Sequence, residues 1–504
     1  MTAVPSIDPR TGETAETVAE ETTTDEVDRI CQTAHAAADG LEALGRPDRA
    51  ALLDAMADAL DADRDRIVAV ADRETGLGTT RLNGELTRTT YQLRLFGEVL
   101  RDGGYLEATI DHAGDTAMGP RPDLRRMLVP IGPVAVFGAS NFPLAFSVPG
   151  GDTASALAAG CPVVVKAHGS HPATSQLCFD ALTAAARTSG APEGTIGIVH
   201  GVRAGADLVA HPAIRAVGFT GSTAGARALR AIIEERRPEP IPFYGELSSL
   251  NPLVVTPAAA ADRAGAIGTG FAGSFTLGAG PFCTKPGLAF VPAGRDGDAV
   301  VDAIGEAIAA TEPMVMLNEG IADSFARGTA RLAALPGLVP VAHGSSGGEA
   351  PGFRRTPLLF TTTAAELPPE AAEECFGPVA VVVRYADEGE LFAALARLPG
   401  SLTATVHRGP GETALPAELT RRLRPLAGRI LYDGFPTGVA VSWAQHHGGP
   451  WPATNTQHTS VGATAIRRFL RPVTWQDAPD ELLPEELREG YAGVPRRVDG
   501  VLGG

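Results

Sequence analysis

Short apolar runs alternate with helical patterns through the middle of this chain, and that alternation restricts the fold more than any other feature. Four apolar runs cover residues 134–138, 162–166, 195–199 and 216–220. Helical patterns separate them, beginning after Gly151, Pro172 and Gly221. Continuous apolar strands that alternate with helices predict a parallel sheet with helices on both faces.

A second strand–helix series follows Asn251, with apolar runs at 251–256, 288–293, 379–385 and 402–408. Helical spacing of apolar residues also predicts helices from about Thr24 to Asp72. Single hydrophobic cores stop growing near ~250–300 residues. A chain of 504 residues with two such series is therefore expected to form two α/β domains.

Polar residues follow several of the predicted strands. They include Ser140–Asn141, Lys166–His168 and Gly221–Ser222, and Glu246 stands at the end of another strand. The carboxyl ends of parallel strands meet at one edge of a sheet, and ligands bind there. We expect these residues to share one rim.

Composition excludes several partners. The net charge of −17 argues against nucleic acid, which requires a basic face, and against an anionic membrane surface. No apolar run reaches the ~18 residues of a membrane span, and the polar N-terminus resembles no secretory signal. Five cysteines without paired spacing indicate a reducing compartment, so a cytoplasmic location is expected, and no metal site is predicted.

Cys283 is the strongest candidate for chemistry. It lies in the loop GPFCTKPG, after the small residues 278–280 and two residues before Lys285. An open backbone and a nearby cation favour a reactive thiolate. The alternative is a packed, inert thiol, which describes most cysteines.

Four further positions each have an ordinary and a functional interpretation. Asn141 fits a turn or an oxyanion donor, and Glu246 fits a surface carboxylate or a general base. Lys166 either extends to solvent or binds cofactor hydroxyls or phosphate. The Gly221–Ser222 pair is an ordinary helix cap or a phosphate site at a helix N-terminus.

Together these residues belong to a recognisable set of motifs. In chain order they read VAVFGASNFP, FTGSTAGAR, YGELSSLNP, GPFCTKPG, EECFGPVAVV and GVAVSWAQHHGG. The set resembles the aldehyde dehydrogenase superfamily from about Ile7 to Asp499. Within the superfamily, the sequence around Asn141 and the late segment TSVGATAIRRFLRPVTWQ are most similar to those of α-ketoglutaric semialdehyde (2,5-dioxopentanoate) dehydrogenases.

The resemblance implies an α/β fold with a Rossmann-type cofactor domain, an α/β catalytic domain and a small oligomerisation segment. The NAD(P)-binding domain would cover 1–104 and 128–247, and the catalytic domain 248–445. The charged, breaker-rich segment 105–127 and the C-terminal part 446–504 would build a homodimer or homotetramer. The last ~25 residues are expected to run over a surface.

The resemblance also implies roles for single residues. Cys283 would attack the aldehyde, with the Asn141 amide and the Cys283 backbone N–H as oxyanion donors, and Glu246 would activate water to hydrolyse the thioester. Lys166 would act in both catalysis and cofactor-ribose binding. Glu374 would hold the nicotinamide ribose beside Phe376. The expected reaction is oxidation of 2,5-dioxopentanoate to 2-oxoglutarate, with another semialdehyde or an aliphatic aldehyde as the alternative substrate.

Two departures from the family pattern matter. Pro281 replaces the usual glutamine before the nucleophile, which stiffens the loop and removes an N–H. Gly169 stands where NAD-preferring members commonly place a carboxylate, and His168, Ser170 and Arg203 lie near enough in sequence to contact a 2′-phosphate. The missing carboxylate at Gly169 predicts NADP as the cofactor, with NAD as the alternative.

Two other functions compete with this one. An acylating relative would pass the acyl group to coenzyme A or phosphate, but it would not need Glu246 to activate water. A non-catalytic protein with the same fold would need none of Asn141, Lys166, Glu246, Cys283 and Glu374. The intact set favours a dehydrogenase that releases a free carboxylate from a small-molecule aldehyde.

Overall fold

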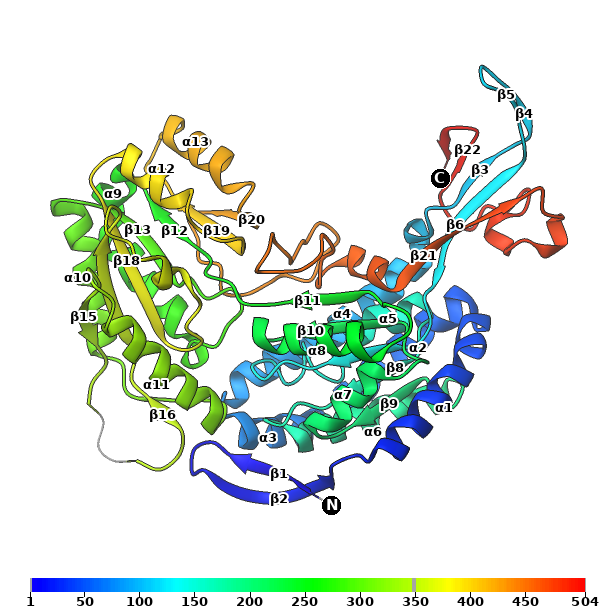
Figure 1. The fold of residues 1–504 in the computed structure, drawn as a ribbon, viewed down its shortest axis with the longest axis horizontal. Helices are drawn as coiled ribbons and strands as arrows, with labels where there is room; N and C mark the ends of the chain where they lie inside the picture. Colours follow the sequence, from blue (N-terminus) through cyan, green and yellow to red (C-terminus); the bar gives the residue numbers. More distant parts are fainter. Residues whose placement is uncertain (1, 347–349, 504) are drawn as a thin grey trace.

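The computed structural model describes residues 2–346 and 350–503. Figure 1 shows two helix-covered sheets beside each other and a smaller sheet that extends from one end. The strand runs and helical patterns of the sequence account for the first two sheets. The third sheet joins segments that are far apart in the chain.

The first sheet has five strands in the order β11-β10-β7-β8-β9, all parallel. Their bounds are β7 (Val134–Phe137), β8 (Val163–Lys166), β9 (Ile196–Val199), β10 (Ala216–Thr220) and β11 (Phe243–Glu246). The four predicted strands are thus confirmed. β7 is buried along its whole length, which explains its continuous apolar sequence.

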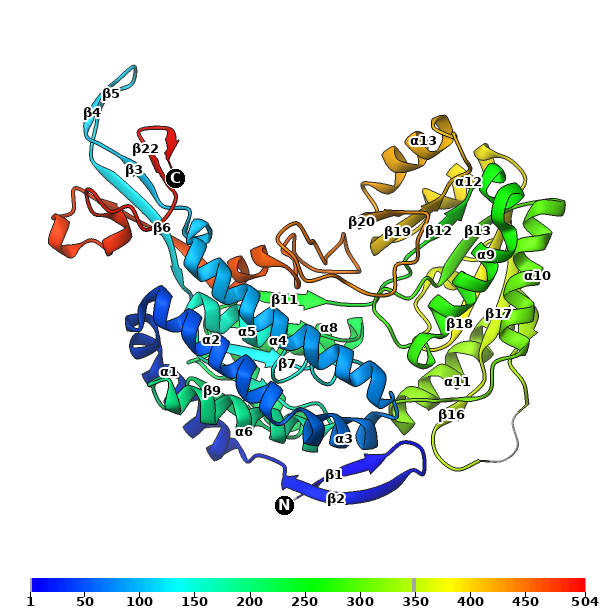
Figure 2. The same cartoon turned by 180° about the vertical axis from the view of Figure 1, so that it is seen from behind.

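Helices cover both faces of this sheet. The connecting helices are α5 (Gly151–Ala159), α6 (Pro172–Thr188), α7 (Val202–Ala210) and α8 (Thr223–Arg236). The predicted N-terminal helices are α1 (Thr24–Ala43), α2 (Gly45–Ala62) and α3 (Arg64–Thr75), followed by α4 (Thr79–Asp102). Figure 2 shows α4 running along this layer from the third sheet toward the second.

The second sheet has seven strands in the order β15-β17-β18-β13-β12-β19-β20, and only β15 is antiparallel to its neighbour. The bounds are β12 (Leu253–Val255), β13 (Leu288–Pro292), β15 (Val339–His343), β17 (Leu358–Thr363), β18 (Val379–Tyr385), β19 (Ser401–His407) and β20 (Ala427–Tyr432). Its helices are α9 (Pro257–Thr276), α10 (Arg295–Ala309), α11 (Glu319–Ala333), α12 (Glu388–Leu395) and α13 (Ala414–Leu423).

The third sheet has the order β21-β6-β3-β22-β23. Its strands are β3 (Thr109–Asp111), β6 (Leu124–Pro130), β21 (Leu470–Gln476), β22 (Arg496–Val498) and β23 (Val501–Gly503). The segment before the first large sheet therefore pairs with C-terminal residues, a pairing that was not predicted from the sequence. The domain boundaries and the oligomeric role of this part stay predictions.

Two small hairpins were not foreseen. β1 (Ala3–Asp8) pairs with β2 (Glu13–Glu20), and β4 (Gly114–Thr116) pairs with β5 (Gly119–Arg121) at the tip of an arm that Figure 1 shows projecting from the third sheet. Their residues are mostly exposed, so the apolar pattern that reveals core strands is missing. In the described part of the chain, no helix is long and apolar enough to cross a membrane.

The strand register of the first sheet builds the predicted rim. Phe137 lies opposite Lys166 and Phe219, and Thr220 lies opposite Glu246. The loops that follow these strands therefore start at one edge of the sheet. The second sheet faces this edge and supplies the rest of the site.

Candidate active site

A cavity of about 820 Å³ lies at this edge. Eight of the predicted site residues line it: Asn141, His168, Gly221, Ser222, Glu246, Cys283, Glu374 and Phe376. Lys166, Ser170 and Arg203 are not among its lining residues, and α11 contributes residues that were not predicted, such as Arg327 and Arg331. The volume suits a dinucleotide-sized ligand, since small-molecule sites commonly measure ~300–1,000 Å³.

The loop that carries Cys283 is tightly fixed. Gly278, Ala279 and Gly280 have left-handed φ values of 56°, 65° and 84°, and a Cβ on Gly280 would collide with the backbone of Gly377. Beyond this turn, Asn251 Nδ2 donates to the carbonyl oxygens of Cys283 (2.8 Å) and Lys285 (2.9 Å). The thiol therefore stands on a backbone with little freedom to move.

Lys285 does not activate the thiol, and that prediction is wrong. Its ammonium group is buried and donates to the carbonyl oxygens of Cys375 (2.6 Å), Gly377 (3.0 Å) and Val379 (3.0 Å). The Lys285 side chain thus holds two loops together. Burial, followed by the negative charge of Glu246, instead raises the pKa of the Cys283 thiol well above its ordinary value.

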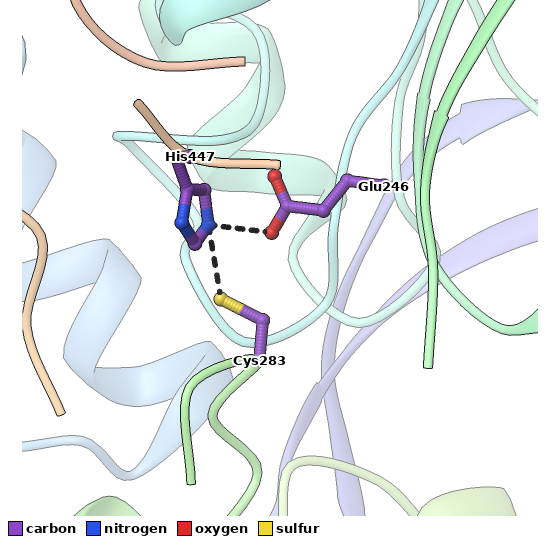
Figure 3. Close-up of side chains that lie close together, drawn as sticks. All are labelled: Glu246, Cys283 and His447. Atoms are coloured by element: carbon purple, nitrogen blue, oxygen red, sulfur yellow. Dashed lines mark hydrogen bonds and ion pairs between the residues drawn. The ribbon is translucent and has the colours of Figure 1, made fainter. Parts of the chain in front are cut away.

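Three side chains meet at the thiol, as Figure 3 shows. His447 Nε2 lies 3.5 Å from Cys283 Sγ and 2.8 Å from Glu246 Oε1. One ring nitrogen therefore reaches both the sulfur and the carboxylate. The three ligand-type atoms lie within 4.8 Å of one another, a spacing that would also suit a soft metal ion. The atoms and distances of these two His447 contacts are those of hydrogen bonds. We therefore interpret the contacts as a path for proton transfer.

Glu246 is buried at the end of β11 and is held on both oxygens. Ser460 Oγ donates to Oε2 at 2.5 Å, and Oε1 faces His447. Burial by itself would raise the pKa of Glu246, but His447, Ser460 and Cys283 together bring it below its ordinary value. The carboxylate is thus ionised and ready to accept a proton.

His447 was not predicted from the sequence as a site residue. It lies 164 residues after Cys283, in an irregular segment that returns to the end of β11. Its backbone N–H donates to Thr459 Oγ1 at 2.7 Å, which fixes the segment over Glu246. Its only sequence signal is its place in the motif SWAQHHGG, and the motif does not say which of two adjacent histidines faces the thiol.

The predicted oxyanion donors lie beside the thiol. Asn141 Nδ2 donates to the carbonyl oxygen of Pro281 at 2.6 Å, so the proline that replaces glutamine anchors the amide through its C=O group. The amide keeps a second proton for another acceptor. Among the residues that the structure describes, the backbone N–H of Cys283 has no acceptor.

The far part of the cavity has features that suit a nucleotide. α8 begins there, capped by Ser222 Oγ, which accepts from Gly225 N at 3.1 Å, and its first amides favour an anion. Burial raises the pKa of Glu374 to about 7, although Lys285, Ser248 and the Ser249 amide act in the opposite direction. The cofactor's phosphates and ribose hydroxyls would match this donor set and this carboxyl group.

Of the four remaining predicted cofactor residues, His168 lines the cavity. Ser170 accepts a hydrogen bond from Asn318 Nδ2 at 2.6 Å, and Arg203 is exposed near the start of α7. Lys166 ends β8, where burial lowers its pKa. Burial and the neighbouring His171 and Lys166 lower the pKa of His168, so its imidazole is neutral at neutral pH.

The raised thiol pKa gives a measurable expectation. Alkylation of Cys283 by iodoacetamide, followed by peptide mass spectrometry, should continue to accelerate above the pH at which an ordinary cysteine reaches its maximum. The reason is that only the thiolate reacts, and its population grows until the pH exceeds the thiol pKa. A rate that levels off by pH 7 would contradict the assignment of a protonated resting thiol.

Comparison with known proteins gives consistent matches. Residues 1–418 match the model of the aldehyde dehydrogenase family. The chain is 48% identical over 482 residues to alpha-ketoglutaric semialdehyde dehydrogenase 2 of Azospirillum brasilense, covering 94% of this chain and 91% of the relative. It is 43% identical over 488 residues to alpha-ketoglutaric semialdehyde dehydrogenase of Acinetobacter baylyi, covering 95% and 92%.

Solved structures share the fold. The structure of 3,6-anhydro-L-galactose dehydrogenase in complex with NADP superposes with a TM-score of 0.79 at 20% identity, covering 94% of this chain and 96% of that one. At this identity the likeness concerns the fold.

Proposed function

This chain belongs to the aldehyde dehydrogenase family, and we propose that it oxidises α-ketoglutaric semialdehyde to 2-oxoglutarate with NADP, using Cys283 as nucleophile. The observation that carries the proposal is the position of His447 Nε2 between Cys283 Sγ and Glu246 Oε1. A thiol, a base and a bridging imidazole in contact at a cavity wall are what a covalent aldehyde oxidation requires.

In the first half of the reaction the thiol adds to the aldehyde carbon. Its proton leaves through His447 Nε2, the group within reach of both sulfur and Glu246. The new C–S bond turns the carbonyl oxygen into an oxyanion, which the Asn141 amide and the Cys283 N–H stabilise. A bound oxidised nicotinamide would supply the hydride acceptor, and loss of hydride from this carbon would leave a thioester on Cys283.

In the second half, water replaces the sulfur. Glu246 and His447 take the proton of the attacking water, the C–S bond breaks, and the carboxylate product leaves the thiol free again. The buried, ionised Glu246 supports hydrolysis over acyl transfer to coenzyme A or phosphate, because those acceptors need no water activation.

The remaining predicted site residues would bind the cofactor. The start of α8 with Ser222 would bind the phosphates, Glu374 the nicotinamide ribose, and Phe376 would lie beside the ring. Lys166, His168, Ser170 and Arg203 would face the adenosine ribose, and the absence of a carboxylate at Gly169 leaves room for a 2′-phosphate. NADP is therefore the proposed cofactor.

The substrate is proposed from the two relatives that act on α-ketoglutaric semialdehyde and resemble this chain over almost its whole length. The test is cofactor reduction with NADP and with NAD over a panel of semialdehydes and simple aldehydes. We expect the highest kcat/KM with α-ketoglutaric semialdehyde and NADP. Arg203→Met should lower kcat/KM selectively when NADP is the cofactor. A clear preference for NAD would refute the cofactor assignment, and a better simple aldehyde would refute the substrate.

A further inference from the structure

Arg88 lies on α4 and brings a positive charge to the reacting thiol without belonging to the large cavity. Its Nε donates to the carbonyl oxygen of Val439 at 3.3 Å, and its guanidinium carbon lies 5.0 Å from the ring centre of Phe146. The Phe146 ring is in turn 6.2 Å from that of His447. The charge of Glu85 acts most strongly on the guanidinium, and the charges of Cys283 and Glu246 reach it as well. Arg88 therefore stands beside the catalytic group, behind Phe146.

The end of this side chain lacks a partner. Nη1 and Nη2 are both buried, and neither finds a hydrogen-bond acceptor among the described residues. Buried cations normally pair with an anion, because otherwise the loss of hydration is not offset. Glu85 lies one turn earlier and its negative charge acts on Arg88. Its Oε1 is engaged by the amides of Leu144 and Ala145 at 2.9 Å, and among the described residues neither Oε2 nor the Arg88 terminal nitrogens have a hydrogen-bond partner.

Two neighbouring arginines differ from Arg88 in this respect. Arg81 uses Nη2 for the carbonyl oxygen of Asn141 (2.7 Å), although its Nη1 is also buried without a partner among the described residues. Arg429 uses both terminal nitrogens for the carbonyl oxygens of Pro436 (2.8 Å) and Gly438 (3.0 Å). They hold loops around the thiol. Arg88 keeps the two nitrogens that together form a fork for a carboxylate.

We propose that Nη1 and Nη2 of Arg88 bind the carboxylate at the far end of the substrate while its aldehyde carbon meets Cys283 Sγ. This inference rests on the proposed function and deepens it, because it assigns the substrate class to one residue. The class is aliphatic aldehydes that end in a carboxylate. The shared contact with Val439 and Phe146 orients the fork in a fixed direction.

The test compares two aldehydes of equal chain length, 5-oxopentanoate and pentanal, in the wild type and in Arg88→Met. Methionine keeps the length and the apolar contact with Phe146 but removes the charge. We expect kcat/KM for 5-oxopentanoate to fall by roughly 10²-fold or more, as for loss of a buried charged partner. Activity on pentanal should change little. Arg66→Met, at a side chain that is 67% exposed, serves as the matched control and should change neither.

Other results would overturn the proposal. Equal losses for both aldehydes would mean that Arg88 only supports the thiolate or balances Glu85. Unchanged kcat/KM for both would mean that the fork has no ligand. If the wild type oxidises none of the aldehydes, the proposed function is rejected. If the wild type is active but Arg88→Met does not lower kcat/KM selectively for 5-oxopentanoate, only the role of Arg88 is rejected.

A measurement on the wild type covers the case in which Arg88→Met does not fold. Pentanoate should slow iodoacetamide alkylation of Cys283 at concentrations where pentanamide does not, because only the carboxylate pairs with the fork. Equal protection by acid and amide would overturn the proposal without any variant.

Discussion

Replacing Cys283 by alanine should reduce aldehyde oxidation by roughly 10⁴-fold or more, since loss of a nucleophile removes the covalent route entirely. The cofactor site should survive, because the alanine keeps the backbone that Asn251 holds and the cavity beyond it. The measurements are steady-state NADPH formation and, separately, cofactor binding by fluorescence titration. Turnover should vanish while the dissociation constant of NADP stays within a few-fold of the wild type.

Cys31→Ala is the matched control for this substitution. Cys31 is a fully buried thiol in α1, far in the chain from the site, and its loss removes one sulfur without touching the mechanism. It should keep the wild-type kcat even where it lowers the melting temperature. Substantial oxidation by Cys283→Ala would reject the nucleophile, and equal loss in both variants would point to a general effect on folding.

Glu246→Gln should separate the two halves of the reaction. Without the carboxylate the thioester is hydrolysed slowly, so kcat should fall by about 10²–10⁴-fold, the usual contribution of a general base. The first half needs no water, and His447 remains in place to take the thiol proton, so rapid mixing should show a burst of reduced cofactor close to one equivalent per active site. Intact-protein mass spectrometry should then find the acyl group on Cys283.

The same substitution should have an opposite effect on the free enzyme. Glu246 is one cause of the raised thiol pKa, so its neutral replacement lowers that pKa and speeds alkylation of Cys283 near neutral pH. Slower alkylation together with no burst would show that Glu246 serves the first half instead. Glu306→Gln, at an exposed carboxylate of α10, should leave burst, kcat and alkylation unchanged.

The sequence predicted the two large sheets because their strands are buried on both faces and read as continuous apolar runs. β7 and β8 were located to within a residue for this reason. The third sheet was missed because β3, β22 and β23 are only three residues each, and Ile110 is the one buried residue among them. Strands so short leave no period to detect, and their pairing joins residues almost 400 positions apart.

The site was predictable where a residue directly follows a strand and less so where distant loops meet. Asn141 and Glu246 come at strand ends, so the parallel register brings them to the cavity. His447 has no strand beside it, and only the folded chain shows its contact with Cys283. Lys285 shows the opposite error, a predicted contact that is absent. It lies two residues from Cys283 in the sequence, but its ammonium group binds buried carbonyl oxygens and not the thiol.

Those carbonyl partners give Lys285 a mechanical part in the molecule. Its ammonium group joins the loop of the nucleophile to the strand entry at residues 375–379, directly after Glu374. Three hydrogen bonds from one ammonium group thus tie the loop of the nucleophile to the segment beside Glu374. Anyone who transplants or redesigns the cysteine loop must therefore carry both segments. The loop alone would leave a buried cation without acceptors, and the 375–379 segment alone would leave three buried carbonyl oxygens without their donor.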